Sequence, residues 1–222
     1  MSNMPENTVL KTARFVKPDG SLIVQPKKCA QLMGNRGKLG PILNQLPQPH
    51  ASGKAWITCI LKKKGVPLPK VDVTYTKLFF LDEVTAFAAG HRPCRQCQSE
   101  RYNEFVAALK KTRLKKGKSV DESLYDDCFD VNGQKKTFSC TLAELPSGVI
   151  VKVPESDQSH LLLWNKLFPW TMNGYDRPIE KSMDTMVSVL TPSLIVQIFK
   201  DGFPLLVNRE ETIHPSILDH LS

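Results

Sequence analysis

The clearest chemical feature of the sequence is a Cys-x-x-Cys pair formed by Cys94 and Cys97. Such a turn sets two thiolates to bind one metal ion, because its backbone amides donate to sulfur and its spacing suits a tetrahedral zinc site. Redox chemistry is the main alternative, but thioredoxin-like pairs lie where a strand leads into a helix, whereas here a predicted helix precedes the pair. The spacing therefore favours metal binding, with zinc as the expected cofactor, over redox chemistry and over unliganded thiols.

The other ligands of a tetrahedral zinc site must come from elsewhere in the chain. Cys59 lies in a predicted strand whose alternate face can point at the pair, and His91 precedes Cys94 by three residues and can share its turn. Cys128 and Cys140 lie far away in sequence and are interpreted as packing residues, since a lone cysteine usually behaves as a small buried hydrophobe. The predicted metal ligands are Cys59, His91, Cys94 and Cys97, with Cys29 and His50 as alternatives from an irregular stretch.

Two predicted helices flank the cysteine pair. Asp82 is suited to cap the first helix, over residues 83–89, and Gly90 is suited to end it, because glycine reaches positive φ at little cost. The second helix begins near Ser99 and has one apolar stripe at the spacing i, i+3, i+4 and i+7. This stripe consists of Tyr102, Phe105, Val106 and Leu109. The pair is therefore expected in a short connection between two helices.

Upstream of these helices the sequence predicts β-structure. Residues 12–24 alternate around a Pro-Asp-Gly-Ser turn and predict a hairpin. Residues 56–61 and 71–81 are rich in β-branched and aromatic residues and predict two strands. Residues 25–52 are expected to be mostly irregular, and the Gly-Asn-Arg-Gly sequence that contains Arg36 is either a backbone nest for a phosphate or, as we favour, an ordinary turn.

Residues 78–97 read Leu-Phe-Phe-Leu-Asp-Glu-Val-Thr-Ala-Phe-Ala-Ala-Gly-His-Arg-Pro-Cys-Arg-Gln-Cys. This stretch resembles the second half of the N-terminal metal-binding domain of Ada-type DNA methylation-repair proteins, which runs from a strand and Phe-Phe through an Ala-rich helix to Arg-Pro-Cys-x-x-Cys. The resemblance implies a small α/β zinc domain with Cys94 and Cys97 as zinc ligands, and a role related to DNA repair. The rest of the chain is similar to a group of bacterial proteins, which implies no activity.

The resemblance does not extend to methyl transfer. In that family the other ligand pair is a Cys-x-x-x-Cys upstream of the strand, and one of its cysteines accepts a methyl group from a DNA phosphotriester. This sequence has only Cys59 in the corresponding region, with no partner four residues away. His91 also stands where the family has an aromatic residue, which is why it is included among the ligand candidates.

Charge is unevenly distributed along the chain. Residues 1–118 contain 22 Lys and Arg against 7 Asp and Glu, whereas residues 119–222 contain 8 against 15. A cationic region attracts polyanions, because each phosphate that it neutralises releases condensed counterions. Nucleic acid is therefore the expected partner of the basic part, and a merely solvated surface is the alternative. The predicted nucleic-acid contacts are Arg36, Arg92, Arg95, Lys110, Lys111, Arg113, Lys115 and Lys116.

The acidic part contains several short alternating runs separated by turns, a pattern typical of a small barrel or a strongly bent sheet. Thr191 and Pro192 are suited to begin a closing helix, as a cap followed by a first-turn proline. The expected fold class is α+β in two parts. The first is a basic, zinc-binding, Ada-like α/β region over residues 1–118, and the second is an acidic, β-rich, barrel-like region over residues 119–222 that a helix closes.

Several functions are excluded by the sequence. It contains no apolar run of about 18 residues, so no membrane contact is expected, and its first residues lack a secretory signal, which predicts a cytoplasmic protein with reduced thiols. Walker, dinucleotide-binding, nucleophile-elbow and kinase motifs are absent. The favoured function is a zinc-binding protein that contacts nucleic acid, as a DNA-binding or DNA-repair-like protein.

Two alternatives of other classes remain open. One is an enzyme, either a zinc-thiolate methyl acceptor or a metal-dependent hydrolase or nuclease in which a carboxylate close in sequence, Asp82, Glu83 or Glu100, acts as base. The other is a structural or protein-interaction module without catalysis.

Overall fold

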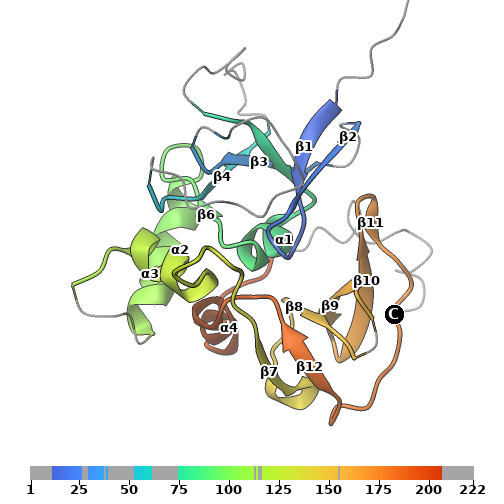
Figure 1. The fold of residues 1–222 in the computed structure, drawn as a ribbon. Helices are drawn as coiled ribbons and strands as arrows, with labels where there is room; N and C mark the ends of the chain where they lie inside the picture. The colour runs from blue at the N-terminus through green and yellow to red at the C-terminus, as the bar shows by residue number, and fades with distance from the viewer. Residues whose placement is uncertain are drawn as a thin grey trace, which may run out of the picture.

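The computed structural model describes residues 12–26, 30–37, 39, 53–61, 75–112, 114, 117–154 and 156–206. In this part of the chain four α-helices accompany two six-stranded sheets, which confirms the predicted α+β class. Figure 1 shows helix α1 between the two sheets, with α2, α3 and α4 gathered beside them. No helix among these residues is both long and apolar enough to span a membrane.

The first sheet is built on the predicted hairpin. Its strands in spatial order are β2 (Leu22–Pro26), β1 (Thr12–Val16), β5 (Leu78–Phe80), β3 (Leu32–Asn35), β4 (Ile57–Ile60) and β6 (Arg92–Pro93). β1 and β2 pair antiparallel around a turn in which Gly20 has a φ of +85°, so the hairpin prediction is confirmed. The strands predicted at 56–61 and 71–81 correspond to β4 and β5, although residues 71–74 lie outside the described part.

Strand β3 corrects the expectation that residues 25–52 are mostly irregular. It lies between β4 and β5 and pairs antiparallel with both. Gly34 is required at this position, because an added Cβ would lie only 2.2 Å from the backbone carbonyl oxygen of Ile57. The Gly-Asn-Arg-Gly sequence is therefore half strand, and the chain bends only at Arg36 and Gly37.

Helix α1 (Glu83–Ala88) lies between the sheets with all six of its residues buried. The Asp82 carboxylate accepts a hydrogen bond from the Thr85 N–H at 2.8 Å, and Gly90 follows the helix end with a φ of +83°, so the predicted cap and stop are both confirmed. The Tyr175 hydroxyl donates to the same Asp82 carboxylate at 2.8 Å. Apolar side chains of α1 join the cores on both sheets, and the helix thereby connects them.

The second sheet is open. Its strands in spatial order are β11 (Gly174–Tyr175), β10 (Lys166–Thr171), β9 (Ser159–Leu163), β8 (Val149–Lys152), β12 (Met186–Val189) and β7 (Phe138–Thr141). β11 and β7 are its edges and do not pair with each other among the described residues, so the barrel-like prediction is not supported. Ile150 packs in the core that contains Val84 and Ala88 of α1, whereas Val149 and Val151 pack in a second core, to which the other helices contribute. Because both faces are covered by other elements, the sheet buries its apolar residues without closing on itself.

Three further helices cover the second sheet and meet the first part of the chain. They are α2 (Ser99–Lys111), α3 (Val120–Cys128) and α4 (Ser193–Lys200). α2 begins where it was predicted, and α4 is the predicted closing helix, although it begins at Ser193 with Pro192 as its cap residue. Phe105 of α2 stacks on Phe87 of α1 at 5.2 Å and packs with Phe203, which follows α4. Aromatic residues from both parts of the chain therefore share one core.

Candidate metal centre

Three cysteine side chains converge beside the first sheet. The Sγ atoms of Cys59, Cys94 and Cys97 all lie within 4.8 Å of one another, with Cys94 buried and the other two half-buried. Two sulfur atoms bound to one zinc ion at about 2.3 Å lie roughly 3.8 Å apart in a tetrahedron, so this three-sulfur cluster fits a thiolate-rich zinc site. In the part of the chain that the structure describes, no histidine or carboxylate joins the cluster.

Backbone pairing between β4 and β6 brings the cysteines together. The Arg92 N–H donates to the Trp56 carbonyl at 3.0 Å, and the Cys94 N–H donates to the Thr58 carbonyl at 2.8 Å. Cys59 directly follows Thr58, so this parallel ladder places the two ligand-bearing segments side by side. The connection between α1 and α2 is thus fixed to the edge of the sheet at the point where its first cysteine appears.

Hydrogen bonds to sulfur polarise the cluster. The Cys94 sulfur accepts from the Cys59 thiol and from the backbone N–H groups of Cys97 and Gln96, which lower the pKa of Cys94 to about 5 against the opposing effect of burial. The same bond to Cys94, together with burial, raises the pKa of Cys59. Burial also raises the pKa of Cys97. Negative charge therefore resides first on Cys94, and a bound cation would favour deprotonation of the other two thiols.

His91 does not join the three sulfur atoms, although it was a predicted ligand. Its side chain is buried between the rings of Trp56 and Phe80, with ring centroids 5.3 and 4.6 Å away. Its Nε2 accepts a hydrogen bond from Arg36 Nε at 3.1 Å. Burial, followed by the charge of Arg36, holds the pKa of His91 well below its usual range, so the ring is neutral.

Arg36 is buried, which corrects its prediction as a nucleic-acid contact. Only 1% of the residue is exposed, and its guanidinium lies 4.2 Å above the Trp56 ring. Nη1 donates to the Gly20 carbonyl at 2.9 Å, in addition to the bond from Nε to His91. Burial lowers the pKa of Arg36 to about 9. The side chain organises the interior next to the hairpin turn and is not available to a phosphate.

The other predicted cations fall into three groups. Arg92 forms a bidentate ion pair with Asp121, in which Nε donates to Oδ1 at 2.5 Å and Nη2 donates to Oδ2 at 2.9 Å. The Arg92 side chain is only 11% exposed. Arg95, Lys110 and Lys111 are exposed. Arg113, Lys115 and Lys116, together with the alternative ligands Cys29 and His50, lie outside the described residues.

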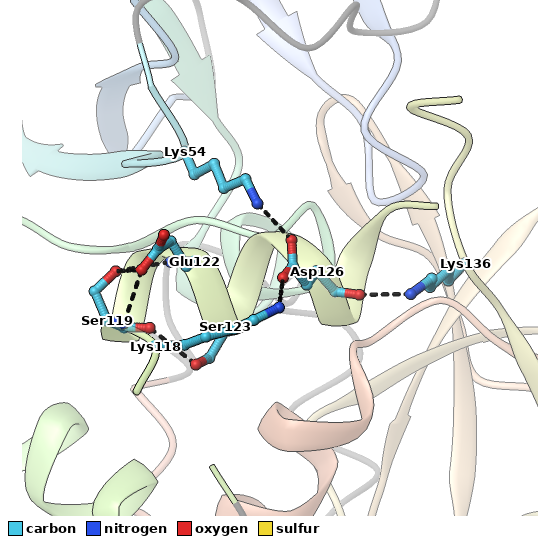
Figure 2. A network of polar contacts seen from close by, with 7 residues as sticks. All are labelled: Lys54, Lys118, Ser119, Glu122, Ser123, Asp126 and Lys136. Atoms are coloured by element: carbon cyan, nitrogen blue, oxygen red, sulfur yellow. Dashed lines mark hydrogen bonds and ion pairs between the residues drawn. The ribbon is translucent and has the colours of Figure 1, made fainter. Parts of the chain in front are cut away.

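Helix α3 carries an ion-pair network that was not predicted from the sequence. Figure 2 shows the Asp126 carboxylate between Lys54, at 2.7 Å, and Lys118. Hydrogen bonds from Lys118 and Lys54 lower the pKa of Asp126 to about 2. The sequence did contain a signal for this helix, because Ser119 and Glu122 form the Ser-x-x-Glu capping box that begins it. Acidic side chains of α3 therefore neutralise cations of the basic part within the molecule.

Two of the three carboxylates considered as catalytic bases have structural partners instead. Asp82 caps α1 and accepts from Tyr175. Glu83 forms a buried, two-pronged ion pair with Arg101, at 2.9 and 2.6 Å. Glu100 is exposed at the start of α2 and does not join the three-sulfur cluster. The described residues therefore supply thiolates but no carboxylate to the candidate centre.

The two remaining cysteines among the described residues, Cys128 and Cys140, serve packing, as predicted. Cys128 is fully buried among aromatic residues of the core next to Trp56, and burial raises its pKa to about 11. Cys140 is partly buried and packs against the core of the second sheet.

Comparison of the chain with known protein families, curated proteins and solved structures finds no match. Any functional conclusion therefore depends on the geometry of the three-sulfur cluster and the residues around it.

Proposed function

We propose that this chain is a zinc-binding protein in which Cys59, Cys94 and Cys97 hold the metal. The observation that carries the proposal is the convergence of three sulfur atoms from two distant segments to within 4.8 Å of one another. Backbone N–H groups already donate to the Cys94 sulfur, as expected for a turn built around a thiolate. A bound zinc ion would supply charge neutralisation and a covalent-like link between β4 and the connection that joins α1 to α2.

Metal content tests this proposal directly. Purified protein should bind one zinc ion per chain, and substitution by cobalt should give the intense visible bands of a tetrahedral thiolate site. Cys59→Ala, Cys94→Ala and Cys97→Ala should each weaken binding strongly, whereas Cys140→Ala is the matched control and should bind as the wild type does. Full metal retention in the first three variants, or no binding by the wild type with excess zinc, would contradict the proposal.

The fourth ligand distinguishes a structural centre from a reactive one. Structural zinc sites have four protein ligands, whereas catalytic sites leave one position to water. Cys29→Ala, His50→Ala and His91→Gln should therefore be compared by cobalt spectroscopy. We expect His91→Gln to retain the wild-type spectrum, because the His91 ring bonds Arg36 instead. A change of spectrum in Cys29→Ala or His50→Ala would identify a closed, structural centre.

Contact with nucleic acid is the second part of the proposal. It is supported by the exposure of Arg95, Lys110 and Lys111, which lie on the segment that runs from the cysteine pair to the end of α2. Binding to DNA or RNA should weaken with added salt. A triple change of these residues to Gln should reduce the slope of log K against log salt by about 0.9 for each phosphate that the variant no longer neutralises.

A matched control uses cations that already have a partner. Lys54 and Lys118 both pair with Asp126, so changing them to Gln should leave the salt slope close to that of the wild type. Absence of binding at low salt, or binding that does not depend on salt, would eliminate this part of the proposal while leaving zinc binding intact.

A further inference from the structure

One carbonyl oxygen connects both sides of the three-sulfur cluster. The Thr58 carbonyl accepts from the Cys94 N–H at 2.8 Å and also from the Gln98 side-chain amide, Nε2, at 2.9 Å. The Gln98 N–H in turn donates to the Cys94 carbonyl at 3.0 Å. Thr58 directly precedes Cys59, and Gln98 directly follows Cys97. Each of these bonds therefore joins residues that are cluster cysteines or their direct neighbours in sequence.

The Gln98 side chain donates to the Thr58 carbonyl and does not cap helix α2. Gln98 occupies the N-cap position of α2, where a side chain normally accepts a hydrogen bond from a free backbone N–H of the first turn. No such bond is present, and the side chain reaches across to β4. Ser, Thr, Asp and Asn are the usual residues at this position, and their side chains are too short to span to a neighbouring strand while they cap.

We infer that Gln98 is a positioning residue for the metal centre, which sets the distance of Cys97 from Cys59. This inference rests on the proposed zinc binding. The Cys94 N–H fixes the first cysteine of the pair to β4, and the Ile60 N–H of the same strand donates to the Cys97 sulfur. The Gln98 side chain adds a further bond to β4 from the residue that follows Cys97. Groups that orient metal ligands by hydrogen bonds typically change metal affinity by about 10- to 100-fold when they are removed.

Substitution by a capping residue separates positioning from ordinary stabilisation. Gln98→Ser and Gln98→Asn can both cap α2 but cannot reach the Thr58 carbonyl, which keeps its bond from Cys94 and is not left unpaired. We expect the metal-free variants to be at least as stable as the metal-free wild type, and their zinc affinity to fall about 10- to 100-fold. If the bond from Gln98 to Thr58 only stabilised the fold, both variants would be less stable than the wild type and their zinc affinity would be unchanged.

Gln96→Ala is the matched control, because Gln96 is an exposed glutamine of the same turn whose backbone N–H to sulfur survives the change. Zinc affinity is measured by competition with a chromophoric chelator, and metal-free stability by urea unfolding. Wild-type affinity in both Gln98 variants would overturn the inference, as would an affinity loss equal to that in Gln96→Ala. Failure of the wild type to bind zinc would instead refute the proposed function itself. If Gln98→Ser does not fold, Gln98→Asn, which retains an amide, carries the same comparison.

Discussion

The three-sulfur cluster and helix α3 both connect segments that are distant in sequence, but they do so by different physics. At the cluster, backbone hydrogen bonds place three thiols together in an arrangement that could hold a metal ion. At α3, Asp126 and the lysines around it already neutralise one another, and their side chains are 25–42% exposed. Exposed ion pairs contribute little to stability, whereas a bound metal contributes its binding free energy. The difference shows that uneven charge along a chain is weak evidence for an external partner, while converging thiols point to a specific ligand.

Metal removal should have the largest effect and tests the first side of this comparison. At a free zinc concentration about 1,000 times Kd, binding to the folded state alone adds about 4 kcal/mol to the free energy of unfolding. The Tm of the wild type should therefore rise with zinc and fall with a chelator, whereas Cys94→Ala should respond to neither. Cys140→Ala should respond as the wild type does. An unchanged wild-type Tm after chelation would show that the cluster holds no stabilising ion.

Acidification should weaken the interior next to the cluster well before it affects α3. His91 is neutral in the fold, since it is buried, its Nε2 accepts from Arg36, and Lys135 adds further positive charge. The unfolded chain binds a proton at His91 below pH 6.5, which the folded chain does not, so stability is fully present above pH 6.5 and is lost as the pH falls below it. The loss is up to about 1.4 kcal/mol for each pH unit.

The measurement is urea unfolding between about pH 7.5 and pH 5 in the presence of a chelator, so that metal release does not contribute. His91→Gln is the comparison variant, because glutamine can still accept from Arg36 but does not titrate in this range. The difference in slope between the two proteins isolates the contribution of His91. Equal slopes would show that His91 accepts a proton in the fold.

Arg92→Met should break the one direct ion pair between the cysteine-bearing connection and α3 among the described residues. The Arg92 side chain is 11% exposed and that of Asp121 28%, so the pair is more than a surface contact but less than a buried one. We expect a loss of about 2 kcal/mol in the free energy of unfolding, measured with urea. A double-mutant cycle with Asp121→Asn should give most of this loss as coupling. Additive effects of the two changes would show that the pair does not hold the two regions together.

The sequence predicted the chemistry of the cluster better than its surroundings. Cys94 and Cys97 follow from their spacing, and Cys59 follows from its place in a strand, because short-range spacing and alternation act locally. His91 is close in sequence, but the chain between it and Cys94 is extended, and its ring enters the core beside Trp56. No local sequence pattern indicates the hydrogen bond between Arg36 and His91, since these two residues meet only through the tertiary fold.

The elements were predicted where local signals agreed and missed where they did not. The hairpin, α1, α2 and α4 each combine apolar periodicity with a turn or capping sequence, and all four are present. β3 is only four residues long and includes Gly34, so it has no strand pattern, and its pairing with β4 and β5 comes from the sheet. The sheet of the acidic part was expected to close into a barrel, but it is open. Alternation of apolar and polar residues indicates that a strand is half-buried, but it does not indicate which element covers the strand.

Asp126→Asn should have the smallest effect and tests the second side of the comparison. The pKa of Asp126 is lowered to about 2 from 3.8, so its contribution is present above pH 3.8 and is lost as the pH falls through 2. Because the carboxylate is 25% exposed and its two lysine partners are 38–42% exposed, solvent screening limits that contribution to less than about 1 kcal/mol, and added salt should reduce it further. Urea unfolding of Asp126→Asn and wild type at low and high salt measures it. A loss of several kcal/mol that persists in high salt would show that the network supports the fold as strongly as a metal centre does, and the contrast between the two regions would disappear.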